Sequence, residues 1–163
     1  RDRSRGRRAD DPRRPGRRQA VSAGTVVCDA SALVAVLVDS GVAGEWATER
    51  LADVALAAPN LAPFEVANIL RRHEIAGHIS ADQAAQAHAD LIDLAVDLWP
   101  YDLLAGRAWQ LRHNVSIYDG AYVALAERLG ATLVTLDRRL QQAPGVACHV
   151  AAPPAQSGSH TAS

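Results

Sequence analysis

Two short stretches decide the fold of this chain. Residues 25–29 read T-V-V-C-D, and residues 132–137 read T-L-V-T-L-D. In each stretch an apolar run rich in β-branched residues, typical of a buried strand, ends at an aspartate and is followed by a helical pattern. We therefore expect Asp29 and Asp137 at the carboxyl ends of parallel strands, which is the edge where open α/β sheets bind their ligands.

The rest of the chain alternates between strand and helix patterns. Strands are expected at residues 25–28, 55–58, 96–99, 132–136 and 146–150, and helices at 30–38, 42–53, 63–76, 80–94, 102–113 and 116–129. Pro63 suits a first helical turn, Ser80 and Gln83 have the spacing of a capping box, and Gly130 ends the last helix. The expected fold class is α/β: a single three-layer domain with a parallel sheet of about five strands flanked by helices.

Composition divides the chain into three parts. The 163 residues suit one domain, and an apolar content of 48% is enough for a single core. Residues 1–20 contain nine Arg and no apolar periodicity, so we expect a disordered Arg-rich extension there. The folded domain is expected at residues 21–152 and a flexible tail, rich in Pro, Gly and Ser, at residues 153–163.

The charge distribution excludes several kinds of site. The extension has a net charge of +6, so the remainder carries about −7 of the total of −1. Such an acidic domain binds nucleic acid poorly by charge alone, unless bound cations or local arginines reverse the sign at the site. All seventeen basic residues are Arg. The absence of Lys excludes sites that require it, including the phosphate-binding P-loop.

Cysteines and the apolar N-terminal run bear on location. Cys28 and Cys148 each fall in an expected strand, and buried thiols are favoured over a disulfide, which fits a reducing cytoplasm. The mostly apolar run at residues 19–38 follows Arg17 and Arg18 and resembles an export signal or a membrane anchor. However, Asp29 lies at its centre and there is no clear small-residue cleavage site, so we expect no membrane association.

Two further acids occupy marked positions. Glu65 lies in F-E-V-A-N-I-L and Asp119 in I-Y-D-G-A-Y, both near expected helix starts and in apolar surroundings. The simplest alternative is that Asp29 and Asp137 only cap the helices that follow them. That alternative does not explain Glu65 and Asp119, because acids are rarely buried without a partner. A shared divalent cation explains all four positions.

Helical spacing adds three residues to the same crevice. Asn68 and Arg72 lie three and seven positions after Glu65, and Tyr122 lies three positions after Asp119. Residues at these spacings share one face of a helix.

Other metal and nucleotide sites do not fit. Haloacid-dehalogenase phosphatases need a second acid two residues after the first, where this chain has Ser31, and a dinucleotide site needs a glycine-rich first turn. His73 and His78 suggest a zinc-protease helix, but they are five residues apart and Gly77 is expected to end that helix. We interpret them as surface histidines.

Four segments together resemble one family. In chain order they are V-V-C-D-A-S-A-L-V, F-E-V-A-N-I-L, Y-D-G-A-Y-V-A-L-A-E and A-T-L-V-T-L-D-R-R-L. They resemble the PIN-domain endoribonucleases, in particular the VapC-type toxins of toxin–antitoxin pairs, over about residues 26–150. Gly120 departs mildly from the family pattern, in which Ala is commoner after the third acid. The Arg-rich extension has no counterpart in that pattern.

The resemblance implies a function and a set of site residues. It implies Mg²⁺- or Mn²⁺-dependent hydrolysis of RNA phosphodiester bonds, a VapB-type antitoxin that inhibits the enzyme, and a homodimer. The implied metal ligands and catalytic residues are Asp29, Glu65, Asp119 and Asp137. Ser31, Thr135 and Asn68 would orient these acids through hydrogen bonds, and Arg72, Arg138 and Arg139 are candidate RNA contacts, with plain solvated arginines as the alternative. The alternative function is an inactive PIN-like module whose acidic pocket engages a basic partner protein.

Overall fold

The computed structural model of the chain describes residues 24–39 and 41–154. The extension expected at residues 1–20 and most of the tail expected at residues 153–163 lie outside these ranges. The three-part division of the chain therefore stays a prediction.

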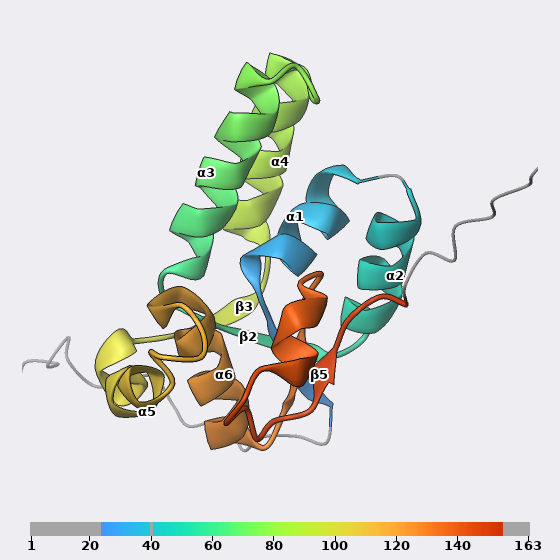
Figure 1. Cartoon of the computed structure of the whole chain (residues 1–163). Helices are drawn as coiled ribbons and strands as arrows, with labels where there is room; N and C mark the ends of the chain where they lie inside the picture. The colour runs from blue at the N-terminus through green and yellow to red at the C-terminus, as the bar shows by residue number, and fades with distance from the viewer. Residues whose placement is uncertain (1–23, 40, 155–163) are drawn as a thin grey trace, which may run out of the picture.

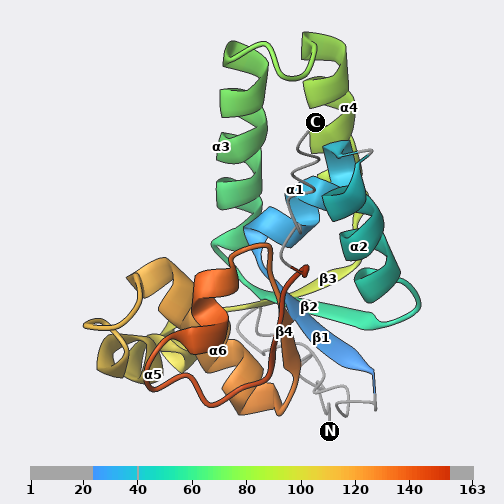
Figure 2. The same cartoon turned by 45° about the vertical axis from the view of Figure 1, so that its right-hand side comes forward.

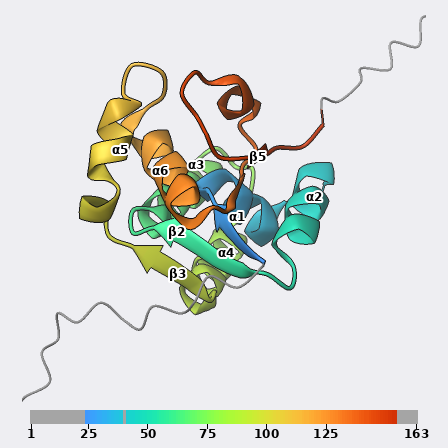
Figure 3. The same cartoon turned by 90° about the horizontal axis from the view of Figure 1, so that it is seen from below.

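The centre of the molecule is a parallel sheet of five strands (Figure 1). The strands are β1 (Thr25–Cys28), β2 (Ala55–Pro59), β3 (Val96–Trp99), β4 (Thr132–Val134) and β5 (Val150–Ala151). Their order across the sheet is β3-β2-β1-β4-β5, and every neighbouring pair is parallel. Figure 3 shows β3 and β5 at opposite margins of this sheet. The α/β fold class expected from the sequence is confirmed.

Helices cover both faces of the sheet. They are α1 (Ala30–Val38), α2 (Val42–Leu51), α3 (Ala62–Ile75), α4 (Ala81–Asp93), α5 (Ala105–Gln110) and α6 (Ile117–Leu129). The chain runs outward from β1 to β3 and then crosses back to β4, on the other side of β1. Right-handed connections therefore place α1 to α4 on one face and α5 and α6 on the other. Figure 2 shows this division, with α1 packed against α2, α3 and α4, and with α6 against β1, β2 and β4.

Small side chains bring the layers close together. The core consists mainly of Ala, Val and Leu, and every residue of α6 from 120 to 126 is buried. A Cβ on Gly120 would lie 3.2 Å from the carbonyl oxygen of Ala108 in α5. This close approach gives a packing reason for glycine at this position, because α5 packs against α6 here. Gly130 ends α6 in the left-handed conformation, as expected.

The α3–α4 pair projects from the sheet as an arm (Figures 1 and 2). Its tip turns at Gly77, whose φ is 73°, and Ser80 and Gln83 form the expected capping box at the start of α4. None of the described helices is by itself long and apolar enough to cross a membrane; α1 and α2 reach that length only together, and they meet at 111°. The apolar run that resembles an export signal contributes β1 and most of α1 to the core.

Three elements differ from the expected ones. The helix expected at residues 102–113 is divided into a 3₁₀ turn, η1 (Tyr101–Leu103), and the short α5. Leu104, between them, stays in the right-handed helical region but with its φ widened to −111°, and its side chain is only 1% exposed. Tertiary burial of Leu104 therefore outweighs the local helical pattern.

The last two strands are shorter than expected. The strand expected at residues 132–136 ends at Val134, because the backbone N–H groups of Leu136 and Asp137 bond the hydroxyls of Ser31 and Thr135. The strand expected at residues 146–150 is only Val150–Ala151. The residues that precede this strand are hydrogen-bonded to side chains from the layer of α5 and α6 instead. Arg107 and Asn114 donate to the carbonyls of Gly145 and Pro144, and Ala147 N–H donates to Glu127.

Candidate functional site

Asp29 is the most buried of the four candidate acids. It follows β1 directly, caps α1, and is only 8% exposed. Its Oδ1 accepts hydrogen bonds from the backbone N–H of Ala32 at 2.9 Å and from the hydroxyl of Ser31 at 2.6 Å, and its Oδ2 accepts from the hydroxyl of Thr135 at 2.5 Å. Asp29 therefore does cap α1, as the capping alternative supposes, but the cap uses only one of its two carboxylate oxygens.

Two hydroxyls join the ends of β1 and β4. The fully buried Thr135 donates to Asp29 and accepts from the backbone N–H of Asp137 at 2.9 Å. Ser31 likewise donates to Asp29 and accepts from the backbone N–H of Leu136 at 2.9 Å. β1 and β4 are neighbours, and the strand order reverses direction between them, so this edge is the topological switch point of the sheet.

Glu65 enters the same region from α3. It lies in the first turn of α3, which begins after β2, and its carboxylate accepts a hydrogen bond of 2.7 Å from the hydroxyl of Tyr122 in α6. Tyr122 is only 3% exposed, and burial raises the pKa of its hydroxyl so that it remains a donor. Partial burial also raises the pKa of Glu65. The bond therefore fixes a half-buried carboxylate between two helices.

Asp119 completes a group of three acids. It lies in the first turn of α6, where the N-cap residue Ser116 donates a 2.7 Å hydrogen bond to its carboxylate. The negative charge of Asp119 raises the pKa of both Asp29 and Glu65. For Asp29 the largest cause of the raised pKa is burial, opposed by its hydrogen bonds to Ser31, Thr135 and Ala32. The three carboxylates therefore share one electrostatic environment at the switch point.

Asp137 is held differently. It caps the 3₁₀ helix η2 (Arg138–Gln142), and its carboxylate forms an ion pair with Arg139 through Nε, at 2.9 and 3.1 Å, and through Nη2, at 2.6 Å. This pairing lowers the pKa of Asp137. The hydrogen bond to Asp137 is the main cause of a raised pKa of the Arg139 guanidinium, and the charge of Asp119 adds to it. The backbone of Asp137 reaches Thr135, but its carboxylate is paired with an arginine.

The donor set suits a hard cation. All candidate ligands are carboxylate oxygens, the ligands that Mg²⁺ and Mn²⁺ prefer, and a cation would relieve the repulsion among Asp29, Glu65 and Asp119. Within residues 24–39 and 41–154, however, no three His, Cys, Asp or Glu side chains form a ready coordination shell in the present arrangement. The residues therefore fit the ion by the chemistry of their donor atoms.

The remaining candidates lie on the surface. Asn68, Arg72 and Arg138 are exposed, and none of them has a side-chain hydrogen bond to an acid of the site within the part of the chain that the structure describes. Ser116, which binds Asp119, is a further site residue beyond those expected from the sequence. The spacing S-x-x-D at residues 116–119 is a capping-box pattern and could have indicated it.

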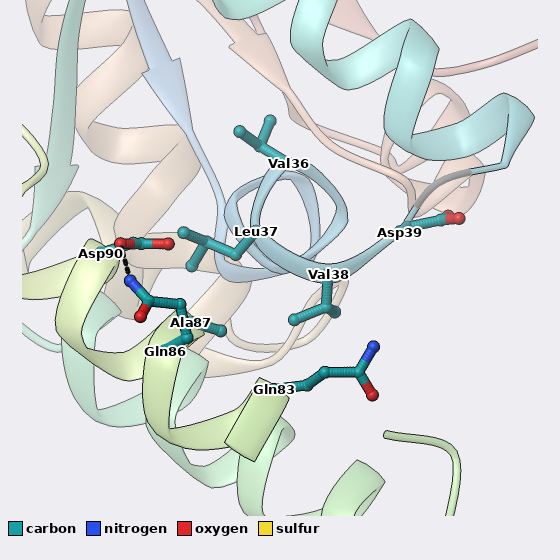
Figure 4. Close-up of a pocket in the computed structure, with 8 residues that line it drawn as sticks. All are labelled: Val36, Leu37, Val38, Asp39, Gln83, Gln86, Ala87 and Asp90. Carbon is teal, nitrogen blue, oxygen red and sulfur yellow. Dashed lines mark hydrogen bonds between the residues drawn. The ribbon is translucent and has the colours of Figure 1, made fainter. Parts of the chain in front are cut away.

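Two cavities in the described part of the molecule are lined by other residues. One cavity of about 320 Å³ lies between the end of α1 and α4 and is lined by Leu37, Gln86 and Asp90, among others (Figure 4). A second cavity, of about 340 Å³, lies between the end of α6 and residues 147–149. None of the four candidate acids lines either cavity.

Known proteins resemble this chain in sequence and in fold. Residues 26–146 match the PIN domain. Ribonuclease VapC1 of Mycobacterium tuberculosis is 39% identical over 76% of this chain and 94% of its own length, and Ribonuclease VapC9 of the same organism is 38% identical over 79% and 98%. Ribonuclease VapC3 of Pyrobaculum aerophilum is 37% identical over 72% and 92%.

Two solved structures share the fold at low sequence identity. M. tuberculosis VapC20, described as a Sarcin-Ricin loop cleaving toxin, superimposes with a TM-score of 0.54 at 20% identity, covering 69% of this chain and 90% of that one. PAE2754 from P. aerophilum gives a TM-score of 0.56 at 22% identity, covering 83% and 92%. Residues 26–146, which match the PIN domain, contain all four candidate acids. The chain therefore belongs to the PIN-domain family, in its VapC branch.

Proposed function

We propose that this protein is a VapC-type endoribonuclease toxin that hydrolyses RNA phosphodiester bonds with the help of Mg²⁺ or Mn²⁺. Its relatives at 37–39% identity are named ribonucleases, and they align with most of the chain. The single observation that carries the proposal is the grouping of Asp29, Glu65 and Asp119 at the switch point of the sheet. There, beside the larger effect of burial, the charge of Asp119 raises the pKa of Asp29 and of Glu65, and the charge of Asp29 raises the pKa of Glu65.

The four acids would hold the ion, and hydrogen bonds from different residues position them. Asp29 is fixed by hydrogen bonds from Ser31, Ala32 and Thr135, and Glu65 is fixed by Tyr122. When bound, a divalent ion supplies a polarised water and neutralises charge at the scissile phosphate. Arginines near the site, of which Arg72 and Arg138 are exposed, would offset the repulsion between an acidic domain and the RNA backbone.

The arrangement supports a basic partner as well as an RNA substrate. Asp137 already accepts a guanidinium from Arg139 in a two-nitrogen contact. An antitoxin of the VapB type that presents a basic side chain could therefore bind the same acids in place of the ion. The same observation keeps a second candidate function open, namely an inactive module that uses its acidic pocket only to bind such a partner. A homodimer remains an expectation from the resemblance.

A cleavage assay separates the two functions. Purified full-length chain would be incubated with total RNA and with defined single-stranded oligomers, in Mg²⁺, in Mn²⁺ and in excess chelator, beside the variant Asp29→Asn. The nuclease proposal expects cleavage that needs the divalent ion and is lost in the variant, with a phosphate on the 5′ end of the product. Cleavage that persists in both chelator and variant would indicate a contaminant. A lack of cleavage by a folded chain would favour the binding module.

A further inference from the structure

Two exposed aromatic side chains, which the proposed chemistry does not use, lie beside the acidic group. Phe64 directly precedes Glu65 in the first turn of α3, and Tyr118 directly precedes Asp119 in the first turn of α6. Their exposed fractions are 78% and 61%. An exposed aromatic ring forgoes the favourable burial of its apolar surface, so two such rings next to two candidate acids point to a ligand.

Helical geometry places Tyr118 over the site. The hydroxyl of Tyr122 reaches Glu65 at 2.7 Å, so this face of α6 is directed toward the first turn of α3. Tyr118 lies four residues before Tyr122 and therefore on the same face, one turn closer to the helix start. The inner tyrosine is buried and holds Glu65, whereas the outer one presents its ring to solvent at the same edge of the sheet.

Polar side chains follow Phe64 along the same face of α3. Asn68 and Arg71 follow Phe64 at four and seven positions and share its face of α3, and all three side chains are exposed. Within the ranges that the structure describes, neither Arg71 nor Arg72 is paired with an acid. An amide and two unpaired arginines thus lie beyond the ring, on the helix that projects from the sheet (Figure 2).

We propose that Phe64 and Tyr118 are a stacking platform for unpaired bases of single-stranded RNA on the two sides of the phosphate at the acidic group, an inference that rests on the proposed nuclease function. Residues 21–163 carry a net charge of about −7, so phosphate contacts alone give this domain little affinity. Stacking does not depend on charge, and it tolerates any sequence because every base has a π face. Bases inside a duplex cannot reach the rings, so the platform selects unpaired RNA.

Ring-removing and ring-keeping variants test the platform. Phe64→Leu and Tyr118→Leu keep an apolar side chain but remove the ring, whereas Phe64→Trp and Tyr118→Phe keep one. Ile75→Ala is the matched control, because Ile75 is 70% exposed at the far end of the same helix. Affinity for a fluorescent single-stranded oligomer would be measured in the full-length Asp29→Asn background, which binds without cleaving. Each Leu variant should weaken binding by roughly fivefold to a hundredfold, the range for one stacked base, while the other variants change it less than twofold.

Kinetics and abasic substrates give a readout that a purely structural role would not move. In the active chain, the Leu variants should raise KM more than they lower kcat. An oligomer with one abasic nucleotide at the stacked position should bind the unchanged protein more weakly, and on that oligomer the matching Leu variant should lose nothing further. Such non-additivity shows that the ring and that base act as a pair.

Several results would overturn the platform. Leu variants that bind and cleave like the Ile75→Ala control would overturn it while leaving the nuclease function intact. Equal losses for single-stranded and duplex RNA would also overturn it. A change in sedimentation without a change in affinity per site would assign the two rings to a protein interface instead. If the unchanged folded chain neither binds nor cleaves RNA, the nuclease function fails and the platform fails with it.

Discussion

The two strand ends that meet at the switch point hold their acids in opposite ways. At the end of β1, Asp29 is 8% exposed and accepts three hydrogen bonds, from Ser31, Ala32 and Thr135. At the end of β4, Asp137 leads into a 3₁₀ helix and pairs with Arg139, whose side chain is 90% exposed. Folding therefore fixes the first carboxylate, whereas the second can exchange its partner at little cost, because exposed ion pairs contribute little to stability.

This difference suggests a division of labour. The Asp29 side, joined by Ser31 and Thr135, is part of the protein core and is prepared before any ligand arrives. The Asp137 side depends on η2 and on the loop after it, which Glu127, Arg107 and Asn114 hold from the opposite layer. We expect substitutions on the first side to affect folding and activity together, and substitutions on the second side to adjust ion binding.

The largest expected effect is loss of activity in Asp119→Asn. The charge of Asp119 adds to the effect of burial in raising the pKa of Asp29 and the pKa of Glu65. Removing it should bring cleavage below detection, because the ion loses a ligand, while relief of repulsion spares or raises the melting temperature. The matched control is Asp93→Asn, at the end of α4. Full activity of Asp119→Asn in excess Mg²⁺, or an unfolded variant, would contradict the assignment.

A large effect on stability is expected for Thr135→Val. The substitution keeps the shape but removes the hydroxyl that donates to Asp29 and accepts from Asp137, leaving two polar groups at a buried position without that partner. Loss of one such partner costs about 1–3 kcal/mol, measurable by urea unfolding. Thr135→Ser should retain most of the stability. If Thr135→Val unfolds at the same urea concentration as Thr135→Ser, the stability of the Asp29 side does not depend on this hydroxyl, which would contradict the prediction.

A smaller, pH-dependent effect is expected for Glu127→Gln, which loosens the loop behind Asp137. The hydrogen bond from Arg107 lowers the pKa of Glu127 below its ordinary value of 4.5, so folding favours the ionised carboxylate. Its contribution to the free energy of unfolding is therefore present above about pH 4.5 and is lost as the pH falls through the lower pKa of the folded state. The difference between wild type and variant should be largest near pH 7 and should shrink toward pH 3. A difference that grows on acidification would contradict the pairing.

The smallest expected effect is on ion affinity in Arg139→Gln. This substitution frees Asp137 from its exposed partner, and an exposed ion pair contributes little to stability. Mn²⁺ should therefore bind up to about fivefold more tightly by calorimetric titration. Arg138→Gln is the control, since the structure gives Arg138 no ion pair with Asp137. Weaker binding in Arg139→Gln would mean that the arginine supports the site and does not compete for it.

The sequence by itself determined the fold class and the positions of the acids along the chain. Short β-branched runs ending at Asp29 and Asp137, and helices with clear start and stop signals, are local features that neighbouring residues decide. The five-stranded parallel sheet follows from their alternation and was confirmed. The ligand roles of the acids remain a prediction.

Only the tertiary structure decided which side chains meet. The Glu65–Tyr122 bond joins residues 57 positions apart, and Thr135 reaches Asp29 across 106 positions. The break at Leu104 and the shortening of β5 likewise follow from burial and from side chains of another layer. Such contacts depend on how helices and strands pack at close range, and no periodicity within a single segment contains that information.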